Sequence, residues 1–395
     1  MHVLQVTPYF PPTWAYGGIP RIVDGLSRAL VEEGVQVTVL TTDAFDASRR
    51  AGTPPDRDHH GVRVLTVPNL SNRLAARHQL FLPRGALGRL TAALDASPPD
   101  VVHLHGHRHL LNNVGVAAAR RWGAPYALTA NGTLHRHENK VGAKVLWDAL
   151  VAGRVPGGAA RCVAVSRSDV GVHQRAGIRP DRVVRIPNGL DLAEFAPLPP
   201  RGTFRARHGL GDQPLVAYLG QISPRKGVDH LVEAFGDGGP QGACLVIAGP
   251  DRGGLEAARR RVAPGAAVHF VGVLEGADRL ALLADADVLV YASTGEIFGL
   301  VPFEGLLCGA PVVVADDCGC GELIGEAGAG LLVRHGDVPG LRARIETLLT
   351  DRDAAGAMVR RGRRYIAERL SFARVARLHI EMYTDMLPHA PPGRA

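Results

Sequence analysis

Two glutamates, Glu296 and Glu304, have the residue type and spacing in this chain that most clearly suggest chemistry. They stand eight positions apart in the segment EIFGLVPFE. Carboxylates accept hydrogen bonds from hydroxyl groups. Between them, the backbone amides of Phe298, Gly299 and Leu300 would point out of a helix N-terminus, which attracts anions. An anion site flanked by two carboxylates suits a phosphorylated ligand with hydroxyl groups on both sides, such as a sugar nucleotide.

The elements expected around these glutamates place both at a ligand-binding edge. The apolar run at 287–292 predicts a buried parallel strand, and 299–309 predicts a helix with Pro302 in its first turn. Glu296 then lies in the loop at the carboxyl end of the strand, where open α/β sheets bind their ligands. Glu304 lies within an apolar helix, where a carboxylate is costly unless it faces a polar cleft.

The rest of the chain predicts an α/β protein of two similar domains. Short apolar strands alternate with amphipathic helices in both halves, which indicates parallel sheets. A proline-rich connector at 196–202 separates the halves, so we expect Rossmann-like domains at 1–195 and 203–370 and a last helix within 371–395. The expected strands are 2–7, 35–41, 62–67, 100–105, 125–130, 161–166, 182–186, 215–219, 243–248, 268–271, 287–292, 311–315 and 330–333. The other expected helices are 19–33, 84–96, 110–122, 140–153, 167–176, 337–350, 353–369 and 371–387.

Composition restricts the class of protein and its expected location. The 395 residues, of which 46% are hydrophobic and 21% charged, are typical of a soluble globular protein with two domains. No run approaches the ~18 apolar residues of a membrane-spanning helix. The first expected strand begins at Val3, which leaves no room for a signal peptide. We therefore expect a cytoplasmic protein.

The positive net charge indicates anionic partners. The charge of +7 comes almost wholly from arginine, because lysine occurs only at Lys140, Lys144 and Lys226. Nucleic acid is not expected, since zinc-finger spacing and aromatic–basic interleaving are absent from the sequence. Peripheral contact with an anionic membrane stays open, because arginines and leucines interleave through 73–89. The five cysteines lack metal-ligand spacing and are expected to be free thiols.

The glutamate segment and the stretch GAPVVVAD at 309–316 resemble the retaining GT-B glycosyltransferases, specifically glycosyltransferase family 4 (glycosyl transferases group 1). The resemblance covers almost the whole chain, because further motifs follow in the family's order. These are YGGI at 16–19, DVVHLHG at 100–106, VSR at 165–167, IPNGLD at 186–191, LGQISPRKG at 219–227 and IAGPD at 247–251. The resemblance implies a GT-B fold, with two Rossmann-like domains facing across a cleft and a C-terminal helix crossing back onto the first.

The resemblance assigns the donor nucleotide to the C-terminal domain. Glu304 would hold the ribose, while the backbone near Val273 and Leu274 would contact the base. Glu296 would contact the transferred sugar. Lys226 would face the diphosphate and neutralise the charge that builds on the leaving group.

Two positions depart from the family's pattern. Relatives usually carry an arginine where this chain has Gln221, and a glutamine supplies hydrogen bonds without charge. Asn131 stands where many relatives carry a histidine near the donor sugar, so we expect it to orient the sugar without acting as an acid or base. The loop at Gly17 and Gly18 allows close approach of a phosphate or sugar. It is not a dinucleotide fingerprint, because TPYFPP at 7–12 replaces the expected glycines.

The implied activity is retaining transfer of a sugar from a nucleoside-diphosphate sugar to a hydroxyl or thiol acceptor. The acceptor would be a sugar, natural product, glycan or lipid held mainly by the N-terminal domain. In relatives the departing phosphate oxygen takes the acceptor proton, so no protein nucleophile and no metal or other cofactor is expected. Histidines 103, 105, 107 and 109 crowd one strand end and are expected to line a polar cleft rather than bind metal.

Alternatives to glycosyl transfer remain. A GT-B nucleotide-sugar 2-epimerase would turn over sugar nucleotide without any acceptor. A non-catalytic sugar-nucleotide binding protein would not need Glu296 for chemistry. A pyridoxal phosphate-dependent phosphorylase is disfavoured, because Lys226 is the only plausible anchor and it begins a loop. The sequence leaves the nucleotide base, the transferred sugar, the acceptor and the oligomeric state open.

Overall fold

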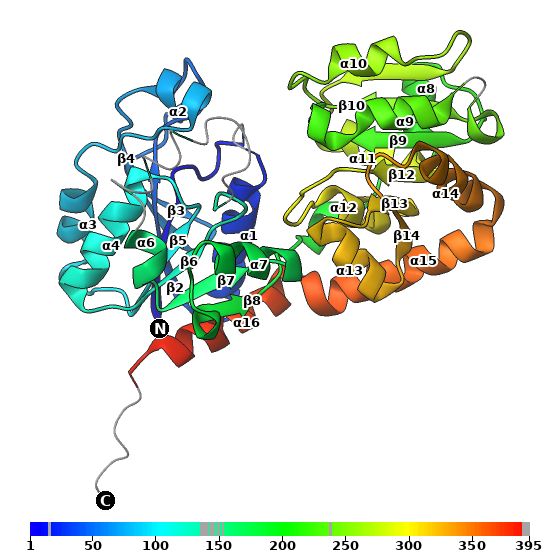
Figure 1. Cartoon of the computed structure of the whole chain (residues 1–395). Helices are drawn as coiled ribbons and strands as arrows, with labels where there is room; N and C mark the ends of the chain where they lie inside the picture. Colours follow the sequence, from blue (N-terminus) through cyan, green and yellow to red (C-terminus); the bar gives the residue numbers. More distant parts are fainter. Residues whose placement is uncertain are drawn as a thin grey trace, which may run out of the picture. The chain divides into compact units, whose positions relative to one another are not determined.

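The computed structural model describes residues 1–14, 17–134, 142, 147, 151, 154–236 and 239–388. The chain divides into two compact units (Figure 1). The first comprises Met1–Leu190 and Leu370–Ala395, and the second comprises Asp191–Arg369. The division falls five residues before the predicted boundary at 195, because the short helix η3 (Leu192–Phe195) packs against helix α12 of the second unit.

The first unit is built on an eight-stranded sheet in the order β3-β4-β2-β1-β5-β6-β7-β8. All neighbouring strands are parallel except β3 and β4. The strands are β1 (His2–Val6), β2 (Gln36–Thr42), β3 (Asp56–His59), β4 (Val62–Val67), β5 (Val101–His105), β6 (Tyr126–Thr129), β7 (Arg161–Ala164) and β8 (Val183–Arg185).

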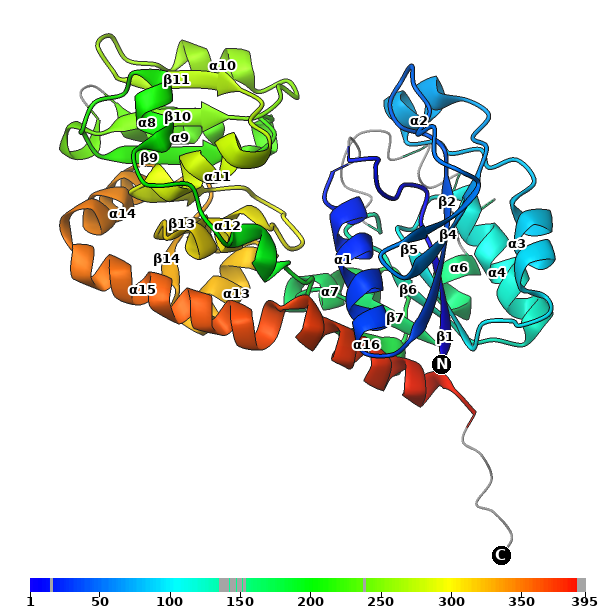
Figure 2. The same ribbon diagram turned by 180° about the vertical axis from the view of Figure 1, so that it is seen from behind.

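Helices cover both faces of this sheet (Figures 1 and 2). They are α1 (Ile19–Glu32), α2 (Asn72–His78), α3 (Ala86–Leu94), α4 (Leu110–Trp122), α6 (Arg154–Gly158), α7 (Arg167–Arg175), η2 (Pro180–Arg182) and α16 (Phe372–Met386). Helix α16 packs beside α1, and their apolar side chains form one core with the strands. The last helix of the chain is therefore part of the first unit, in agreement with the prediction that it crosses back.

Phe372 anchors the start of α16. Its ring occupies the space that side chains at Gly25 and Gly189 would need, since a Cβ atom there would lie 2.0 Å and 2.3 Å from the ring. The backbone beside it is held by two hydrogen bonds. Leu190 N donates to Leu370 O at 2.7 Å, and Phe372 N donates to Leu190 O at 3.3 Å.

The second unit is a doubly wound domain around a six-stranded parallel sheet, in the order β11-β10-β9-β12-β13-β14. Its strands are β9 (Leu215–Leu219), β10 (Cys244–Ala248), β11 (Val268–Gly272), β12 (Val288–Tyr291), β13 (Val312–Ala315) and β14 (Gly330–Val333). Its helices are η3, α8 (Thr203–His208), η4 (Pro224–Lys226), α9 (Val228–Phe235), η5 (Pro240–Gly242), α10 (Leu255–Arg260), α11 (Gly276–Asp285), α12 (Val301–Cys308), α13 (Gly319–Ala327), α14 (Val338–Thr350), α15 (Arg352–Tyr365) and the π-helical turn η6 (Ile366–Leu370).

The predicted strands are all present, with ends shifted by up to two residues. The predicted fold class, two parallel-sheet α/β domains, is confirmed. Strand β3 was not predicted, because its sequence DRDH is polar, lies at the sheet edge and carries no apolar pattern. The helices that were not predicted are α2, α6, α8, α9, α10, α11 and α13. The predicted helix at 140–153 falls largely outside the described residues. No helix in the described part of the chain combines the length and apolar composition that crossing a bilayer requires.

Candidate functional site

Glu296 lies in the loop after β12, as predicted, and its carboxylate is held by three side chains. Lys226, which ends η4 after the neighbouring strand β9, forms an ion pair with Glu296 Oε2. Tyr291 Oη donates to the same oxygen at 3.2 Å, and Ser293 Oγ lies 3.3 Å from it. Lys226 Nζ also donates to Tyr291 Oη at 2.8 Å. The structure therefore brings together Lys226 and Glu296, which the sequence separates by 70 positions.

The electrostatics of this cluster keep Glu296 ionised and Tyr291 protonated. Burial raises the pKa of Glu296, but the charge and hydrogen bond of Lys226 outweigh it and leave that pKa below its usual value. Burial, reinforced by the charge of Glu296, places the pKa of Tyr291 well above its usual value. Lys226 is only 7% exposed, so its ammonium is directed into the cluster and not into solvent. The result is an anion, a cation and a hydroxyl donor at the carboxyl ends of adjacent strands.

The loop that carries Glu296 is fixed by helix α13. Gly319 N, in the first turn of α13, donates to Glu296 O at 2.7 Å. Gly299 has a φ of +74°, and a Cβ atom there would lie 2.9 Å from Cys320 Sγ. Only glycine fits this turn without strain. The Sγ atoms of Cys318 and Cys320 lie 3.3 Å apart, and both are free thiols, as predicted.

Glu304 occupies the buried face of α12, where it is 3% exposed. Arg279 of α11 donates from Nη1 to Glu304 Oε2 at 2.5 Å. The same guanidinium forms an ion pair with Glu194 of η3. We expected Glu304 within a helix of apolar neighbours, and this is what the structure shows. Sequence reasoning missed Arg279, because its pairing depends on how α11 packs against α12.

Helix α12 begins two residues later than predicted. Its first residue is Val301 and its N-cap is Leu300, with Pro302 in the first turn as expected. Gly299 and the buried Phe298 therefore belong to the turn that leads into the helix. Gly299 has a left-handed backbone conformation, which cannot be part of a right-handed helix, so α12 begins only after this residue. An anion site at the amides of residues 298–300 stays a prediction.

The other residues predicted to contact the donor follow strands β9 and β11 of the second unit. Gln221 is exposed and follows β9; its carbonyl oxygen accepts from Tyr218 Oη at 2.7 Å. Arg225 is directed to Gly295 O, 3.3 Å from its Nη1 atom. Val273 follows β11 and is 58% exposed, with Leu274 beside it. Contacts of residues 273–274 with a base stay a prediction.

The predicted residues of the first unit lie at the carboxyl ends of its strands. Gly18 is the N-cap of α1, and Gly17 has a φ of +93°. Asn131 follows β6 with a φ of +49°. Its side-chain oxygen and nitrogen are buried without a hydrogen-bond partner among the described residues. Such an unsatisfied amide in a left-handed backbone is typical of a position kept for a ligand.

The histidines at the end of β5 are buried in the first unit. His103 contacts Tyr383 Oη at 2.6 Å through Nδ1 and Thr129 Oγ1 at 2.7 Å through Nε2. Burial lowers the pKa of His105 to about 3, so its ring is neutral. Within the described residues there is no cluster of metal-ligating side chains. His103 joins the sheet to α16 through Tyr383 and His379, so the expectation that it lines a polar cleft is wrong. His109 packs instead against the rings of Tyr9 and Phe81.

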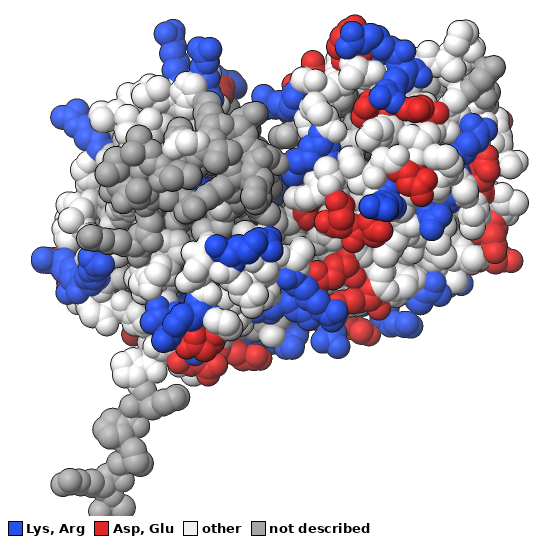
Figure 3. Space-filling model, in the orientation of Figure 1, with Lys and Arg blue, Asp and Glu red and all other residues white. Residues whose placement is uncertain are grey.

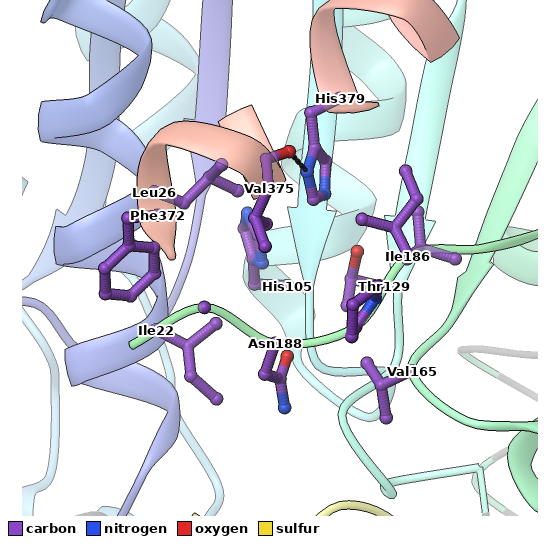
Figure 4. A pocket seen from close by; sticks show the side chains of 13 residues that line it. Ile22, Leu26, His105, Thr129, Val165, Ile186, Asn188, Phe372, Val375 and His379 are labelled. Carbon is purple, nitrogen blue, oxygen red and sulfur yellow. Dashed lines mark hydrogen bonds between the residues drawn. The ribbon is translucent and has the colours of Figure 1, made fainter. Parts of the chain in front are cut away.

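His105 does line a small pocket inside the first unit (Figure 4). The pocket lies between the sheet, α1 and α16, and most of its lining side chains are apolar. His105 and Thr129 come from strands, Ile22 from α1, and Val375 and His379 from α16. The lining is suited to close packing rather than to a charged ligand.

Charged side chains are spread over the visible surface of the second unit (Figure 3). Figure 3 shows basic and acidic side chains interspersed over the visible face of the second unit. In the first unit, Leu87 is 41% exposed within the arginine-containing region 73–89 that suggested membrane contact, whereas Phe81 of the same region is buried. Peripheral membrane contact stays a prediction.

Comparison with known proteins identifies relatives for both units. Residues 17–189 match the family described as glycosyl transferase 4-like domain, and residues 200–365 match glycosyl transferases group 1. A D-inositol 3-phosphate glycosyltransferase of Xylanimonas cellulosilytica is 30% identical over 96% of this chain and 94% of its own length. A GDP-mannose-dependent alpha-mannosyltransferase of Mycolicibacterium smegmatis is 30% identical over 86% of each chain.

Solved structures show the same architecture. Sucrose-phosphate synthase from Thermosynechococcus elongatus superposes with a TM-score of 0.73 at 22% identity, covering 98% of each chain. Anabaena HepE in complex with UDP and glucose gives a TM-score of 0.72 at 19% identity, covering 98% of this chain and all of its own. The two parallel-sheet units have the fold of these GT-B proteins. The chain therefore belongs to the glycosyl transferases group 1 and is a glycosyltransferase of the GT-B type.

Proposed function

We propose that this chain is a retaining glycosyltransferase that moves a sugar from a nucleoside-diphosphate sugar to an acceptor hydroxyl. The proposal rests chiefly on the contact between Lys226 and Glu296 at the carboxyl ends of β9 and β12. A cation for the diphosphate next to a carboxylate for the sugar hydroxyls fits the point where a glycosyl phosphate bond breaks.

Each residue has a defined part in the proposed reaction. The bond between the anomeric carbon and the phosphate oxygen breaks as the bond to the acceptor oxygen forms on the same face. The departing phosphate oxygen takes the acceptor proton, which gives a glycoside and a nucleoside diphosphate. Lys226 neutralises the charge on the departing diphosphate. Glu296 accepts hydrogen bonds from the sugar, and Asn131 orients it.

The ion pair between Lys226 and Glu296 sets a condition on donor binding. A bound diphosphate must compete with Glu296 for the ammonium of Lys226. Tyr291 can offset part of that competition, because its protonated hydroxyl donates to Glu296. Donor binding then exchanges one anionic partner of Lys226 for another, while Glu296 accepts hydrogen bonds from sugar hydroxyls in place of the ammonium.

The nucleotide and the acceptor are proposed only as classes. Relatives are named for GDP-mannose and for inositol phosphate, and HepE is in complex with UDP and glucose. UDP-glucose and GDP-mannose are therefore the first donors to test, and polyols, sugar phosphates and lipid-linked sugars the first acceptors. We propose that no metal ion is needed.

Transfer with each donor, measured with and without an acceptor mixture and with EDTA, tests the proposal. We expect acceptor-dependent release of nucleoside diphosphate that EDTA does not abolish, and a glycoside whose anomeric configuration, read from NMR coupling constants, matches the donor. Turnover of sugar nucleotide without an acceptor would identify a 2-epimerase instead. Tight binding of nucleotide with no turnover of any donor would identify a binding protein, and an inverted product would exclude retention.

A further inference from the structure

The hydroxyl of Tyr291 lies between the two charged side chains of the candidate site and is closed off from solvent. It accepts from Lys226 Nζ at 2.8 Å and donates to Glu296 Oε2 at 3.2 Å. The ammonium also lies 5.0 Å from the centre of the Tyr291 ring. Because Tyr291 is only 4% exposed, it acts on a ligand only through its two charged neighbours.

Two glycines fix the position of the Tyr291 ring. A Cβ atom at Gly299 would lie 3.1 Å from Cε1 of the ring, and a Cβ atom at Gly220 would lie 3.8 Å from Cε2. Gly220 follows β9 and Gly299 precedes α12, so the ring is packed between two segments that carry the candidate site. The phenol oxygen is therefore held in one place, and its two hydrogen bonds are preorganised.

The hydrogen-bonding groups at this point allow Lys226 to take a further partner. A phenol hydroxyl accepts one hydrogen bond and donates another at the same time. Burial and the charge of Glu296 place the pKa of Tyr291 well above its usual value, so the hydroxyl keeps its proton for Glu296. An ammonium has three N–H groups, and within the described residues those of Lys226 have two partners, Tyr291 and Glu296.

We propose that Tyr291 is a positioning residue that lets Lys226 be shared between Glu296 and the donor diphosphate. This inference rests on the proposed function, in which Lys226 faces the diphosphate and Glu296 the transferred sugar. When the ammonium turns toward a phosphate oxygen, Glu296 loses part of its compensation, and a buried carboxylate without a partner is unfavourable. The hydrogen bond from Tyr291 remains, so it reduces that penalty and keeps the carboxylate aligned for the sugar.

A double-mutant cycle measures this role. Titration calorimetry with UDP and with GDP compares Tyr291→Phe with wild type, and Tyr291→Phe/Glu296→Gln with Glu296→Gln. Tyr291→Phe keeps the packed ring and removes the hydroxyl, so we expect nucleotide affinity to fall roughly three- to tenfold, on the scale of one hydrogen bond. In the Glu296→Gln background the same change should leave affinity unchanged or slightly higher, since no carboxylate then competes for Lys226.

Tyr126→Phe is the matched control for the loss of a buried hydroxyl. Tyr126 is a buried residue of β6 in the first unit, and its hydroxyl donates to Val155 O at 2.8 Å. We expect this variant to bind nucleotide like wild type and to show a small fall in Tm. Tyr291→Phe should show a similar fall. If Tyr291→Phe unfolds while Tyr126→Phe does not, the hydroxyl is a requirement of the fold and the inference is overturned.

The remaining outcomes separate the inference from the proposed function. Wild-type affinity in Tyr291→Phe, or an equal loss of affinity in both backgrounds, overturns the inference and leaves glycosyl transfer untouched. A loss confined to the background that retains Glu296, in a protein that transfers no sugar from any donor, supports the sharing of Lys226 and overturns the proposed transfer. A wild-type protein that binds neither nucleotide overturns both.

Discussion

The ammonium of Lys226 lies 2.8 Å from the phenol oxygen of Tyr291, and both groups contact one carboxylate oxygen of Glu296. The residue expected at the diphosphate and the residue expected at the sugar are therefore partners before any donor binds. Their functions are coupled, because a change in one alters the charge that the other meets. This coupling determines the direction of several predicted effects.

Replacing Glu296 should separate nucleotide binding from turnover. Glu296→Gln removes the negative charge that competes for Lys226, so we expect the nucleoside diphosphate to bind as tightly as to wild type or a few fold more tightly. Turnover should fall, because a sugar contact that strengthens in the transition state is lost. Calorimetry with free nucleotide and an initial-rate assay check the two effects. Wild-type turnover would remove Glu296 from the reacting centre.

Replacing Glu304 should weaken the donor and the free nucleotide alike. Glu304→Gln takes away a charged acceptor for the ribose that both ligands contain, at a cost of roughly 1.5–3 kcal/mol of binding free energy. Parallel titrations with donor and nucleoside diphosphate measure it. Glu346→Gln on α14 is a matched control, because that glutamate is half-exposed and pairs with Arg342 on its own helix. An effect on the donor alone would place Glu304 at the sugar instead.

The Lys226–Glu296 pair should stabilise the fold in a pH-dependent way. The pKa of Glu296 in the folded protein lies below the value of 4.5 expected in the unfolded chain. The stabilisation of the fold by this carboxylate is therefore fully present above about pH 4.5. It is lost as the pH falls through the folded pKa. The difference in Tm between wild type and Glu296→Gln should therefore be largest near neutral pH and shrink below about pH 4. Thermal melts from pH 3 to pH 8 test this; a difference that grows in acid would contradict the assigned sign.

Gln221→Arg should tighten the binding of the free nucleoside diphosphate. The gain is a charge-assisted hydrogen bond of roughly 1.5–3 kcal/mol, less an ordering cost of up to ~2 kcal/mol for the exposed side chain. We expect a net effect of a few fold that grows at low salt, since the contact is ionic. Titrations of both proteins at two salt concentrations measure it. Equal affinities at both concentrations would show that position 221 does not face the diphosphate.

The fold was predictable because its signal is local and repeated. Every expected strand is present, since an apolar run of four to seven residues between turns marks a buried parallel strand wherever it occurs. Strand β3 was missed because its polar edge sequence has no such pattern. The start of α12 was placed two residues early, because sequence alone did not show that Gly299 adopts a left-handed turn.

The sequence predicted which residues form the candidate site, but it did not predict which of them are in contact. Glu296, Glu304 and Lys226 were chosen from motifs, and the segments that carry them follow β12 and β9, which pair side by side. The pairing of Lys226 with Glu296 requires the strand order, which the chain order does not reveal. The pairing of Glu304 with Arg279 requires the packing of one helix on another. Such contacts depend on side-chain positions across 25 to 70 residues of sequence, where local patterns carry no information.

The packing of the Phe372 ring against Gly25 and Gly189 affects the order in which the two units can fold during synthesis. The second unit is a single uninterrupted stretch, so its sheet is complete once residue 369 has been synthesised. The first unit begins earlier but is completed later, because its core lacks the α16 side chains until residues 372–386 have been synthesised. N-terminal folding units usually mature first during synthesis. In this chain the N-terminal unit can complete its core only after α16 has been synthesised.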